Sequence, residues 1–534
     1  MDNDQTIFQS QSSPTQPLEP VPASVSQQPS FVSPVESLTQ PATVSPVPEA
    51  PVESVQTPAF YPPVNPVPSE QFVQSPPAEI VANEPIVQNP PSQNPVKPAG
   101  GNAVALLKKF FKVGIGLIVV LVIIALLFTV ILPKLLGNAN SKVTLTYWGL
   151  WEDSNTMQSL IADFERQNPN ITINYSMQDP KQYRERVLTR IANGNGPDIF
   201  RFHNTWYPMY ASVLLPLPVD TMTSTDFKKT FYPVAQNDLV KNGAIYGIPL
   251  EIDTLSLYVN TSLFQTVGLQ PPTNWNDFIN DARELTVKDA DGKIKTAGAA
   301  LGTYDNITHA PDIMSLLFLQ NGVNVSKMQD SSDRATNALN FYTSFATDQN
   351  NVWDNTLDPS ILAFSKGNLA MYFGYSWDYF TIKQDNPNLN FKLVPVPQLP
   401  NQNINLASYW AEGISVKSTH QKEALLFIKF LAQKSTEESL YAQQAKTRAF
   451  GEPYARVDLG ATLKTNPVLG TVINQSASAL SSPFIDNTYD NGLNQQLNTY
   501  LGNAINAVIN GDSPQTAIAT LIDGVTQVLQ KYGQ

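Results

Sequence analysis

Paired carboxylates are the residues of this chain whose spacing could support acid–base chemistry. Glu251 and Asp253 follow the segment 247–250 at alternate positions, so in an extended chain both side chains point to the same side. Two acids on one face suit glycoside hydrolysis, which needs a proton donor and a base or nucleophile at a defined separation. They suit hydrogen bonding to sugar hydroxyls equally well. Because the sequence shows no means of holding one acid protonated, we expect both residues to bind a ligand rather than to catalyse.

Nucleophilic chemistry has less support in the sequence. The chain contains no Cys and three His, and none of the three stands near a nucleophile-elbow pattern. The nearest candidate, residues 374–378, lacks the second Gly that permits a sharp strand-to-helix turn. We interpret Ser376 as a loop residue and predict no catalytic residue, so the chain is not expected to be an enzyme.

Metal binding is not indicated either. No two His residues have helical or zinc-finger spacing, and the segment 289–293, which resembles the start of a calcium loop, lacks the downstream glutamate because position 300 is Ala. Asp291-Gly292 is interpreted as a hairpin turn. We predict no metal site and no cofactor.

Aromatic side chains give a stronger indication of a ligand site. Trp148 and Trp151 leave the first predicted strand, and Trp206 follows the third. Later connections rich in Gly, Ser and Asn carry Tyr375, Trp377, Tyr379, Tyr409 and Trp410. In open α/β sheets the ligand crevice lies beyond the carboxyl ends of the strands, where flat faces can stack on sugars. Packing in a core is the alternative for each Trp, and we expect it for Trp275, which begins a predicted helix.

The elements that must position these residues alternate between strand and helix. Strands are predicted at 143–148, 171–175 and 198–200, and the intervening helices have apolar residues with the spacing of one helical face at 155–167 and 183–191. This βαβαβ order predicts an α/β fold with parallel strands. Further helices are predicted at 275–285, 335–345, 422–432 and 514–529.

Residues 142–534 have an ordinary globular composition. A stretch of about 390 residues is too long for a single core, so two lobes are expected. The whole chain has a formal net charge of −12. No basic stripe is present to attract a phosphate backbone, so nucleic acid is not an expected partner.

Residues 104–136 contain a predicted membrane anchor. The run 113–133 holds twenty-one residues without a charge, and as a helix it would be about 30 Å long, which matches the hydrocarbon core of a bilayer. Lys108, Lys109 and Lys112 precede it, so the amino terminus is expected in the cytoplasm and the later residues outside. A cleaved signal peptide is the alternative, but its apolar core would be roughly 7–15 residues long and close to the amino terminus. We expect a single-pass protein of the cell membrane.

Residues 1–103 form a Pro-rich segment of low complexity. They hold about half of the 43 prolines, and a single Lys stands against nine acidic residues. Such a segment cannot bury enough apolar surface to offset chain entropy, so a disordered, extended tail is expected. It is either a docking segment for a Pro-recognising cytoplasmic partner or an inert spacer, which we favour.

The order of segments in residues 142–534 resembles the family 1 extracellular solute-binding proteins of ABC importers, the maltose-type sugar-binding family. The matching segments are 144–148, 164–169, 196–199, 246–249, 257–260, 263–264, 268–275, 364–371, 374–377 and 424–431. Each segment alone is weak, but their collinear order at family-like spacing is specific.

This resemblance implies a two-lobed periplasmic-binding-protein-like fold with hinge crossings, preceded here by the transmembrane helix and the disordered tail. The chain would cross between lobes near 250–257, 407–414 and Arg448, with the ligand held between the lobes. The implied ligand contacts are Trp148, Trp151, Asn204, Trp206, Glu251, Asp253, Trp377, Trp410 and Arg448.

The implied function is capture of a carbohydrate, an oligosaccharide, for the permease subunits of an ABC transporter. The chain departs from the family pattern in two respects, since a transmembrane helix replaces the usual lipoprotein anchor and the tail has no counterpart. A second hypothesis therefore stays open: ligand closure outside the cell could change what the tail recruits inside it.

Overall fold

The computed structural model describes residues 142–534. The predicted tail (1–103) and anchor (104–136) lie outside this range and stay predictions. Among the residues that the structure describes, no helix is both long and apolar enough to cross a bilayer. The predicted solute-binding region, 142–534, coincides with the described part of the chain.

The first lobe is built on a five-stranded sheet with the order β2-β1-β3-β14-β6. Its strands are β1 (Val143–Gly149), β2 (Ile171–Met177), β3 (Ile199–His203), β6 (Ile248–Pro249) and β14 (Trp410–Ile414). β1 runs parallel to both β2 and β3, while β14 is antiparallel to β3 and to β6. The predicted βαβαβ unit with parallel strands is confirmed.

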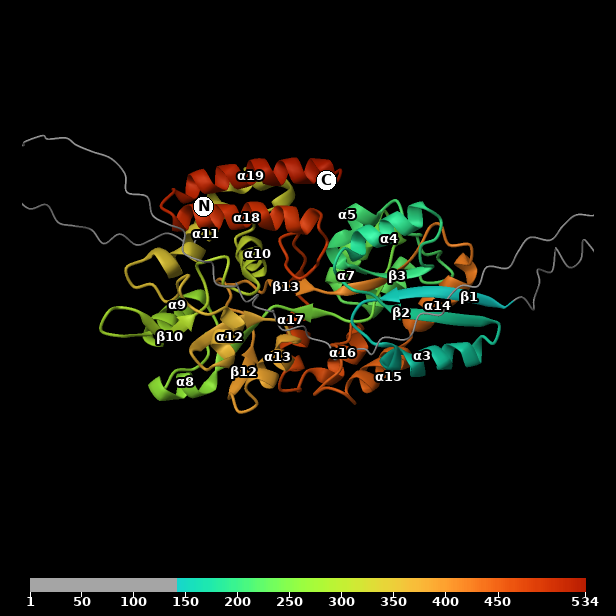
Figure 1. Cartoon of the computed structure of the whole chain (residues 1–534), viewed down its shortest axis with the longest axis horizontal. Coiled ribbons are helices and arrows are strands. Elements are labelled where there is room, and N and C mark those ends of the chain that lie inside the picture. The colour runs from blue at the N-terminus through green and yellow to red at the C-terminus, as the bar shows by residue number, and fades with distance from the viewer. Residues whose placement is uncertain (1–141) are drawn as a thin grey trace, which may run out of the picture. The chain divides into compact units, whose positions relative to one another are not determined.

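Helices pack on both faces of this sheet, with α3 below β1 and β2 and α4 above them in the view of Figure 1. α3 (Ser154–Gln167) begins after Asp153, whose carboxylate accepts a hydrogen bond from the Thr156 amide, and it buries Met157, Leu160 and Phe164. The other helices of this lobe are α4 (Tyr183–Ala192), α5 (Tyr207–Tyr210), α6 (Ser224–Thr230), α7 (Pro233–Leu239), α14 (Gln421–Leu431) and α15 (Lys434–Gln444).

The second lobe is built on another five-stranded sheet, with the order β12-β8-β11-β10-β9. Its strands are β8 (Ser256–Asn260), β9 (Val287–Lys288), β10 (Ile294–Ala299), β11 (Leu369–Gly374) and β12 (Phe391–Val394). β9 and β10 are antiparallel, and Gly292 between them has φ of 81°, so the predicted hairpin turn at Asp291-Gly292 is confirmed.

The helices of the second lobe are α8 (Thr261–Val267), α9 (Trp275–Glu284), α10 (Ala310–Gln320), α11 (Ser332–Thr347), α12 (Ser360–Ser365) and α13 (Asp378–Asp385). Trp275, at the start of α9, is fully buried, and its indole N–H donates to the Gln320 side chain over 2.6 Å. The expectation that Trp275 belongs to the core is confirmed.

A small three-stranded sheet, β15-β13-β7, lies along the crossings between the two lobes. The chain passes from β6 of the first sheet through β7 (Asp253–Thr254) to β8 of the second, and it returns through β13 (Asn405–Ser408) to β14. These are the first two crossings that the resemblance predicted. Two paired strands at the hinge therefore hold residues 251–254 and 408–410 close together.

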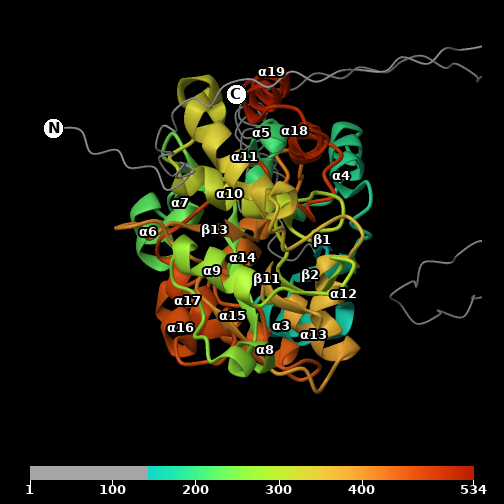
Figure 2. The ribbon, with the colours of Figure 1, turned by 90° about the vertical axis from the view of Figure 1, so that its left-hand side faces the viewer.

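The last part of the chain runs along both lobes. After α16 (Val457–Leu463), α17 (Leu469–Ser476) and β15 (Ala479–Leu480), the segment 484–492 leads into α18 (Leu493–Ile509), which pairs with α19 (Pro514–Lys531). Figures 1 and 2 show α18 and α19 together on the side of the molecule opposite α8. The remaining elements are two strands, β4 (Val240–Lys241) and β5 (Ala244–Ile245), and two 3-10 helices, Asn204–Trp206 and Val325–Ser331.

Candidate functional site

A cavity of about 430 Å³ lies where the two lobes meet the hinge strands. Its lining residues come from the loop after β1 and the end of β3 in the first lobe, the start of α13 in the second, the hinge segments 251–253 and 408–410, the loop after α15, and the segment 484–492. They are Trp151, His203, Glu251, Asp253, Trp377, Asp378, Ser408, Tyr409, Trp410, Arg448, Glu452, Asp486, Asn487 and Tyr489. We take this cavity as the candidate ligand site.

The structure brings most of the residues that the sequence singled out to this cavity: Trp151, Glu251, Asp253, Trp377, Trp410 and Arg448. Glu251 and Asp253 both line it, as their alternate spacing along an extended segment predicted. Contact of any of these side chains with a ligand remains a prediction.

Three predicted contacts, Trp148, Asn204 and Trp206, are not among the lining residues. Trp148 packs half-buried against the core of the first lobe, and Trp206 is fully buried. The 3-10 helix Asn204–Trp206 turns the Trp206 ring inward after β3, where it packs edge-on behind Trp410 with ring centroids 5.2 Å apart. Trp206 therefore supports a lining residue instead of facing the cavity.

Asn204 also has its hydrogen bonds inside the protein. Its amide nitrogen donates to Asp238 and to Ser481, over 3.0 and 2.7 Å, and its amide oxygen accepts from the Tyr409 backbone over 3.3 Å. Ser481 also donates to Asp238. Asn204 is 2% exposed, so it fixes the backbone before Trp410 and leaves no free group for a ligand.

Aromatic rings from both lobes and from the segment 484–492 gather at the cavity. Trp151 meets Trp410 edge to face, with centroids 5.5 Å apart, and lies 6.4 Å from the Tyr489 ring. On the second lobe, Trp377 stacks on Tyr375 with centroids 4.3 Å apart and an angle of 16° between the rings. Trp151 is 41% exposed, so its ring is available for stacking on an apolar face of a ligand.

Two carboxylates from the hinge segment differ in their partners. Asp253 accepts hydrogen bonds from the backbone amides of Thr254 and Ser376 and, over 2.6 Å, from the Ser376 hydroxyl. Among the described residues, nothing donates to the carboxylate of Glu251, although Glu251 is only 8% exposed. Burial raises the pKa of both carboxyl groups well above the ordinary range.

Arginines contribute two positive charges at or behind the cavity. Arg201, fully buried beneath it, binds Glu152 and Glu412 over 2.6 Å each. Arg448 binds Glu452 over 2.7 Å, and its guanidinium lies over the Phe380 ring. Buried Nε and Nη2 atoms of Arg448 have no hydrogen-bond partner within residues 142–534. Arg448 therefore keeps donor capacity for a ligand.

Sequence reasoning missed a buried histidine, His309, which lies behind the lining residues Asp378 and Asp486. His309 donates from Nε2 to Asp378 and from Nδ1 to Asp486, each over 2.9 Å. Burial favours the neutral ring, but the carboxylates of Asp486 and Asp378 together raise the pKa of His309 well above its ordinary value. The only local signal was Pro311, two residues on, which marks a helix start. The partners of His309 lie far along the chain.

His309, Asp312 and Asp486 are close enough to hold a metal ion, with one ligand atom of each within 4.8 Å of the others. Both ring nitrogens of His309 already face carboxylates, which suits a doubly protonated ring that has no lone pair for a metal. The Asp312 carboxylate accepts from the Tyr375 hydroxyl and from the Asp486 amide. The cluster therefore works as an ion-pair network that fixes Tyr375, on which Trp377 stacks.

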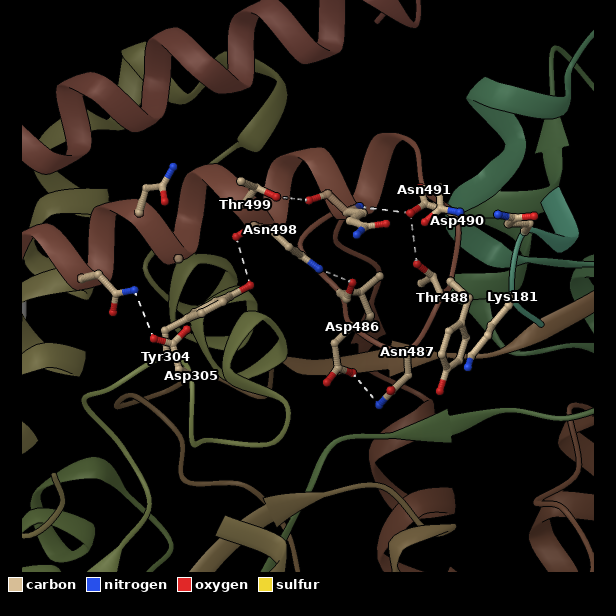
Figure 3. Close-up of a pocket in the computed structure, with 17 residues that line it drawn as sticks. Lys181, Tyr304, Asp305, Asp486, Asn487, Thr488, Asp490, Asn491, Asn498 and Thr499 are labelled. Atoms are coloured by element: carbon tan, nitrogen blue, oxygen red, sulfur yellow. Dashed lines mark hydrogen bonds between the residues drawn. The ribbon is translucent and has the colours of Figure 1, made fainter. Parts of the chain in front are cut away.

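A second hollow of about 700 Å³ shares Asp486, Asn487 and Tyr489 with the cavity (Figure 3). One face of α18 forms its wall, where Gln495, Asn498, Thr499, Gly502, Asn503 and Asn506 follow helical spacing. Figure 3 shows Tyr304 lying along α18 with its hydroxyl donating to the Asn498 carbonyl over 3.0 Å. A Cβ at Gly502 would come within 2.7 Å of this ring. The result is a groove rich in amides along α18, called the amide groove below, with the Tyr304 ring laid flat in it.

Known proteins share this sequence pattern and this fold. A multiple sugar-binding protein of Streptococcus mutans is 24% identical over 322 residues, which are 57% of this chain and 74% of the relative. A maltotriose-binding protein of Pyrococcus abyssi is 23% identical over 120 residues, 22% of this chain and 25% of the relative.

Solved structures agree with the two-lobed architecture. A cyclo/maltodextrin-binding protein complexed with maltotetraose superposes with a TM-score of 0.60 at 19% identity, covering 72% of this chain and 97% of that one. The mannobiose-bound protein CpMnBP1 superposes with a TM-score of 0.53 at 23% identity, covering 72% and 100%. The family model described as bacterial extracellular solute-binding protein matches residues 148–438, more than half of the chain. The chain therefore belongs to the family of bacterial extracellular solute-binding proteins.

Proposed function

We propose that this protein is a membrane-anchored extracellular receptor that captures a carbohydrate and presents it to the permease of an ABC transporter. The carrying observation is the composition of the cavity. Trp151, Trp377 and Trp410 supply flat apolar faces. Beside them, Arg448 supplies donors without a partner among the described residues, and Glu251 supplies a carboxyl group. A pyranose has an apolar face and a rim of hydroxyls, and this combination matches both.

Two further observations support an oligosaccharide over a single sugar unit. The amide groove along α18 continues from the cavity through Asp486, Asn487 and Tyr489, and it offers amide donors and acceptors beside the Tyr304 ring. The maltotriose-binding relative and the maltotetraose-bound neighbour both take oligosaccharides. A chain of sugar units could occupy the cavity and extend into the groove.

Calorimetry with an oligosaccharide panel tests this function. The full chain is best held in lipid nanodiscs, because sugar-headed detergents would compete for the site. Saturable binding of a sugar, with affinity that rises with chain length up to the groove, supports the proposal. If no sugar binds and another small solute does, the ligand is not a carbohydrate and the proposal is wrong.

The same preparation tests the hydrolase alternative. Glu251 and Asp253 are held in a site whose acids could act as proton donor and base, but the proposal requires binding without turnover. Incubation with the bound oligosaccharide should release no reducing ends. Steady release that Glu251→Gln abolishes would favour hydrolysis.

A further inference from the structure

The cavity holds more negative than positive charge. Five carboxylate residues line it, namely Glu251, Asp253, Asp378, Glu452 and Asp486, against one arginine, Arg448, and no lysine. His309 lies behind the wall, in contact with two of these carboxylates. Which carboxylates already have a positive partner decides what the ligand must supply.

Three of the five carboxylates have a cationic partner in the protein. Glu452 binds Arg448 over 2.7 Å. Asp378 and Asp486 share His309 at 2.9 Å each. One positive ring between two carboxylates leaves that trio with a net negative charge when both acids are ionised.

The two carboxylates on the hinge segment have no such partner. Asp253 is held by amides and a hydroxyl, which are neutral donors. Glu251 accepts no hydrogen bond from any residue in 142–534, although it is more than nine-tenths buried and lines the cavity. Burial raises the pKa of the Glu251 carboxyl group, so the unliganded protein favours its protonated form, and a cation bound beside it would favour the carboxylate.

Arg201 cannot serve as the missing partner. Its positive charge lowers the pKa of Glu251 against the larger effect of burial, but its guanidinium is already bound by Glu152 and Glu412. That group of three side chains carries a net negative charge when both acids are ionised. The surroundings of Glu251 therefore favour an added cation.

The rings at the cavity suit a cation as well. Trp151, Trp377 and Trp410 present electron-rich faces, which attract an ammonium group within about 6 Å of the ring. A sugar that carries an amino group combines an apolar face for stacking with a positive charge for the carboxylate.

From these contacts we infer that the ligand is an amino sugar, an oligosaccharide with at least one free amino group, whose ammonium binds the Glu251 carboxylate. The inference rests on the proposed function and narrows its substrate class. Asp253, next on the same face of the segment, is the second acceptor for this group.

Matched sugars test the charge directly. Calorimetry of the full chain in nanodiscs compares a β-1,4-linked glucosamine dimer and tetramer with the N-acetylated and the 2-hydroxy sugars of the same linkage and length; a second set uses α-linked sugars. The free amine should bind about tenfold more tightly or better than both neutral forms, since a charge-assisted hydrogen bond replaces a neutral one. Raising the salt concentration should weaken the amine form more.

Variants distinguish an effect of the Glu251 carboxylate from an effect of the overall negative charge of the protein. Glu251→Gln keeps the shape and should remove most of the preference for the amine, measured as the ratio of the dissociation constants of the amine and its neutral counterparts in the same variant. Glu284→Gln, an exposed acid at the end of α9, is the matched control and should leave the preference unchanged. Melting curves report whether Glu251→Gln folds. If it does not, the test uses Asp253→Asn and the comparison of amine with neutral sugars on the unaltered protein.

The outcomes separate this inference from the function beneath it. Neutral sugars that bind as tightly as their amines, or a preference that survives Glu251→Gln in folded protein, would overturn the amino-sugar inference and leave carbohydrate binding intact. A panel in which no sugar binds would overturn the proposed function, and the inference with it.

Discussion

Single tryptophans in this domain have two different environments, and substitutions should separate them. Trp377 and Trp410 are partly buried at the cavity, each with a ring behind it, Tyr375 or Trp206. Loss of one stacking face should weaken ligand binding roughly tenfold to a hundredfold, as expected for the apolar area involved. Calorimetry of Trp377→Ala and Trp410→Ala measures this, and the melting temperature of unliganded protein should change little.

Trp275 provides the opposite case. It is fully buried among Phe278, Phe341 and Phe373, and its indole N–H bonds Gln320. Trp275→Ala should cost about 3–5 kcal/mol of unfolding free energy through the cavity that it leaves. The dissociation constant of molecules that remain folded should stay the same. If Trp377→Ala and Trp410→Ala behave like Trp275→Ala, they are core residues and the site lies elsewhere.

His203 should make the unliganded domain sensitive to acid. It is buried between Thr205, Ser408 and the Trp410 ring, and burial lowers the pKa of its imidazole to about 3. The unfolded chain takes up this proton near pH 6.5, so stability present above that value is lost as the pH falls toward the folded pKa. The slope from this residue is at most about 1.4 kcal/mol per pH unit.

Urea unfolding of the unaltered protein and of His203→Gln at pH 7, 6 and 5 isolates this effect. The variant should lose less stability on acidification, so the free energy of unfolding of the unaltered protein should fall relative to that of the variant from pH 7 to pH 5. His309, whose pKa is raised, works in the opposite direction but is present in both proteins. Parallel pH profiles would show that His203 is not held neutral.

At the scale of elements, most of the first lobe could be predicted because its signals are local. β1, α3, β2 and α4 begin and end within two residues of the predicted limits, since each has its own apolar period and its own boundary residues. The pair Glu251 and Asp253 was predictable for the same reason, since alternation along an extended segment decides which side both acids occupy.

Long-range contacts could not be predicted in this way. Trp151 and Trp410 meet only because β14 returns to pair with β3, and no local pattern records that pairing. Trp206 was wrongly given the same position as Trp151, because aromatic type at a strand exit does not reveal that the next turn folds the ring inward. The buried His309 network was missed because its carboxylates come from residues 378 and 486.

Close packing of β10 on α9 gives an element-scale prediction. A Cβ at Gly298 would lie 1.8 Å from the Ala282 carbonyl oxygen and 2.5 Å from its carbon, so Gly298→Ala must push the strand and the helix apart. Overpacking of this kind costs about 1–3 kcal/mol. Chemical denaturation measures it.

Gly243→Ala is the control for Gly298→Ala. Gly243 has φ of 80° but no atom within 4 Å of an added Cβ, so Ala at this position meets only the strain of a left-handed backbone. It should cost less, about 1 kcal/mol. Equal costs at the two positions would mean that β10 and α9 can separate easily.

At the scale of the whole molecule, a site lined by both lobes predicts closure on binding. A ligand shifts an equilibrium between open and closed states only by its higher affinity for one of them. A ligand that contacts Trp151 and Trp377 together binds the closed state more tightly, because these residues belong to different lobes. Small-angle scattering of residues 142–534 should show a smaller radius of gyration with saturating ligand. Trp377→Ala should reduce that change. Identical scattering curves with and without ligand would contradict hinge closure.

The position of this domain relative to the membrane gives the last prediction. The charge-free run 113–133 has three lysines just before it and one, Lys134, just after it, which favours a cytoplasmic tail and an external binding domain. Since the chain has no cysteine, single cysteines can report each side. Thr465→Cys, on the exposed surface, should react with an impermeant maleimide in intact cells, and Ser54→Cys only after permeabilisation. The reverse pattern would place the domain inside. Reaction of both in intact cells, or release of the protein by alkaline carbonate, would mean that the run does not span the bilayer, so that capture outside would need another anchor.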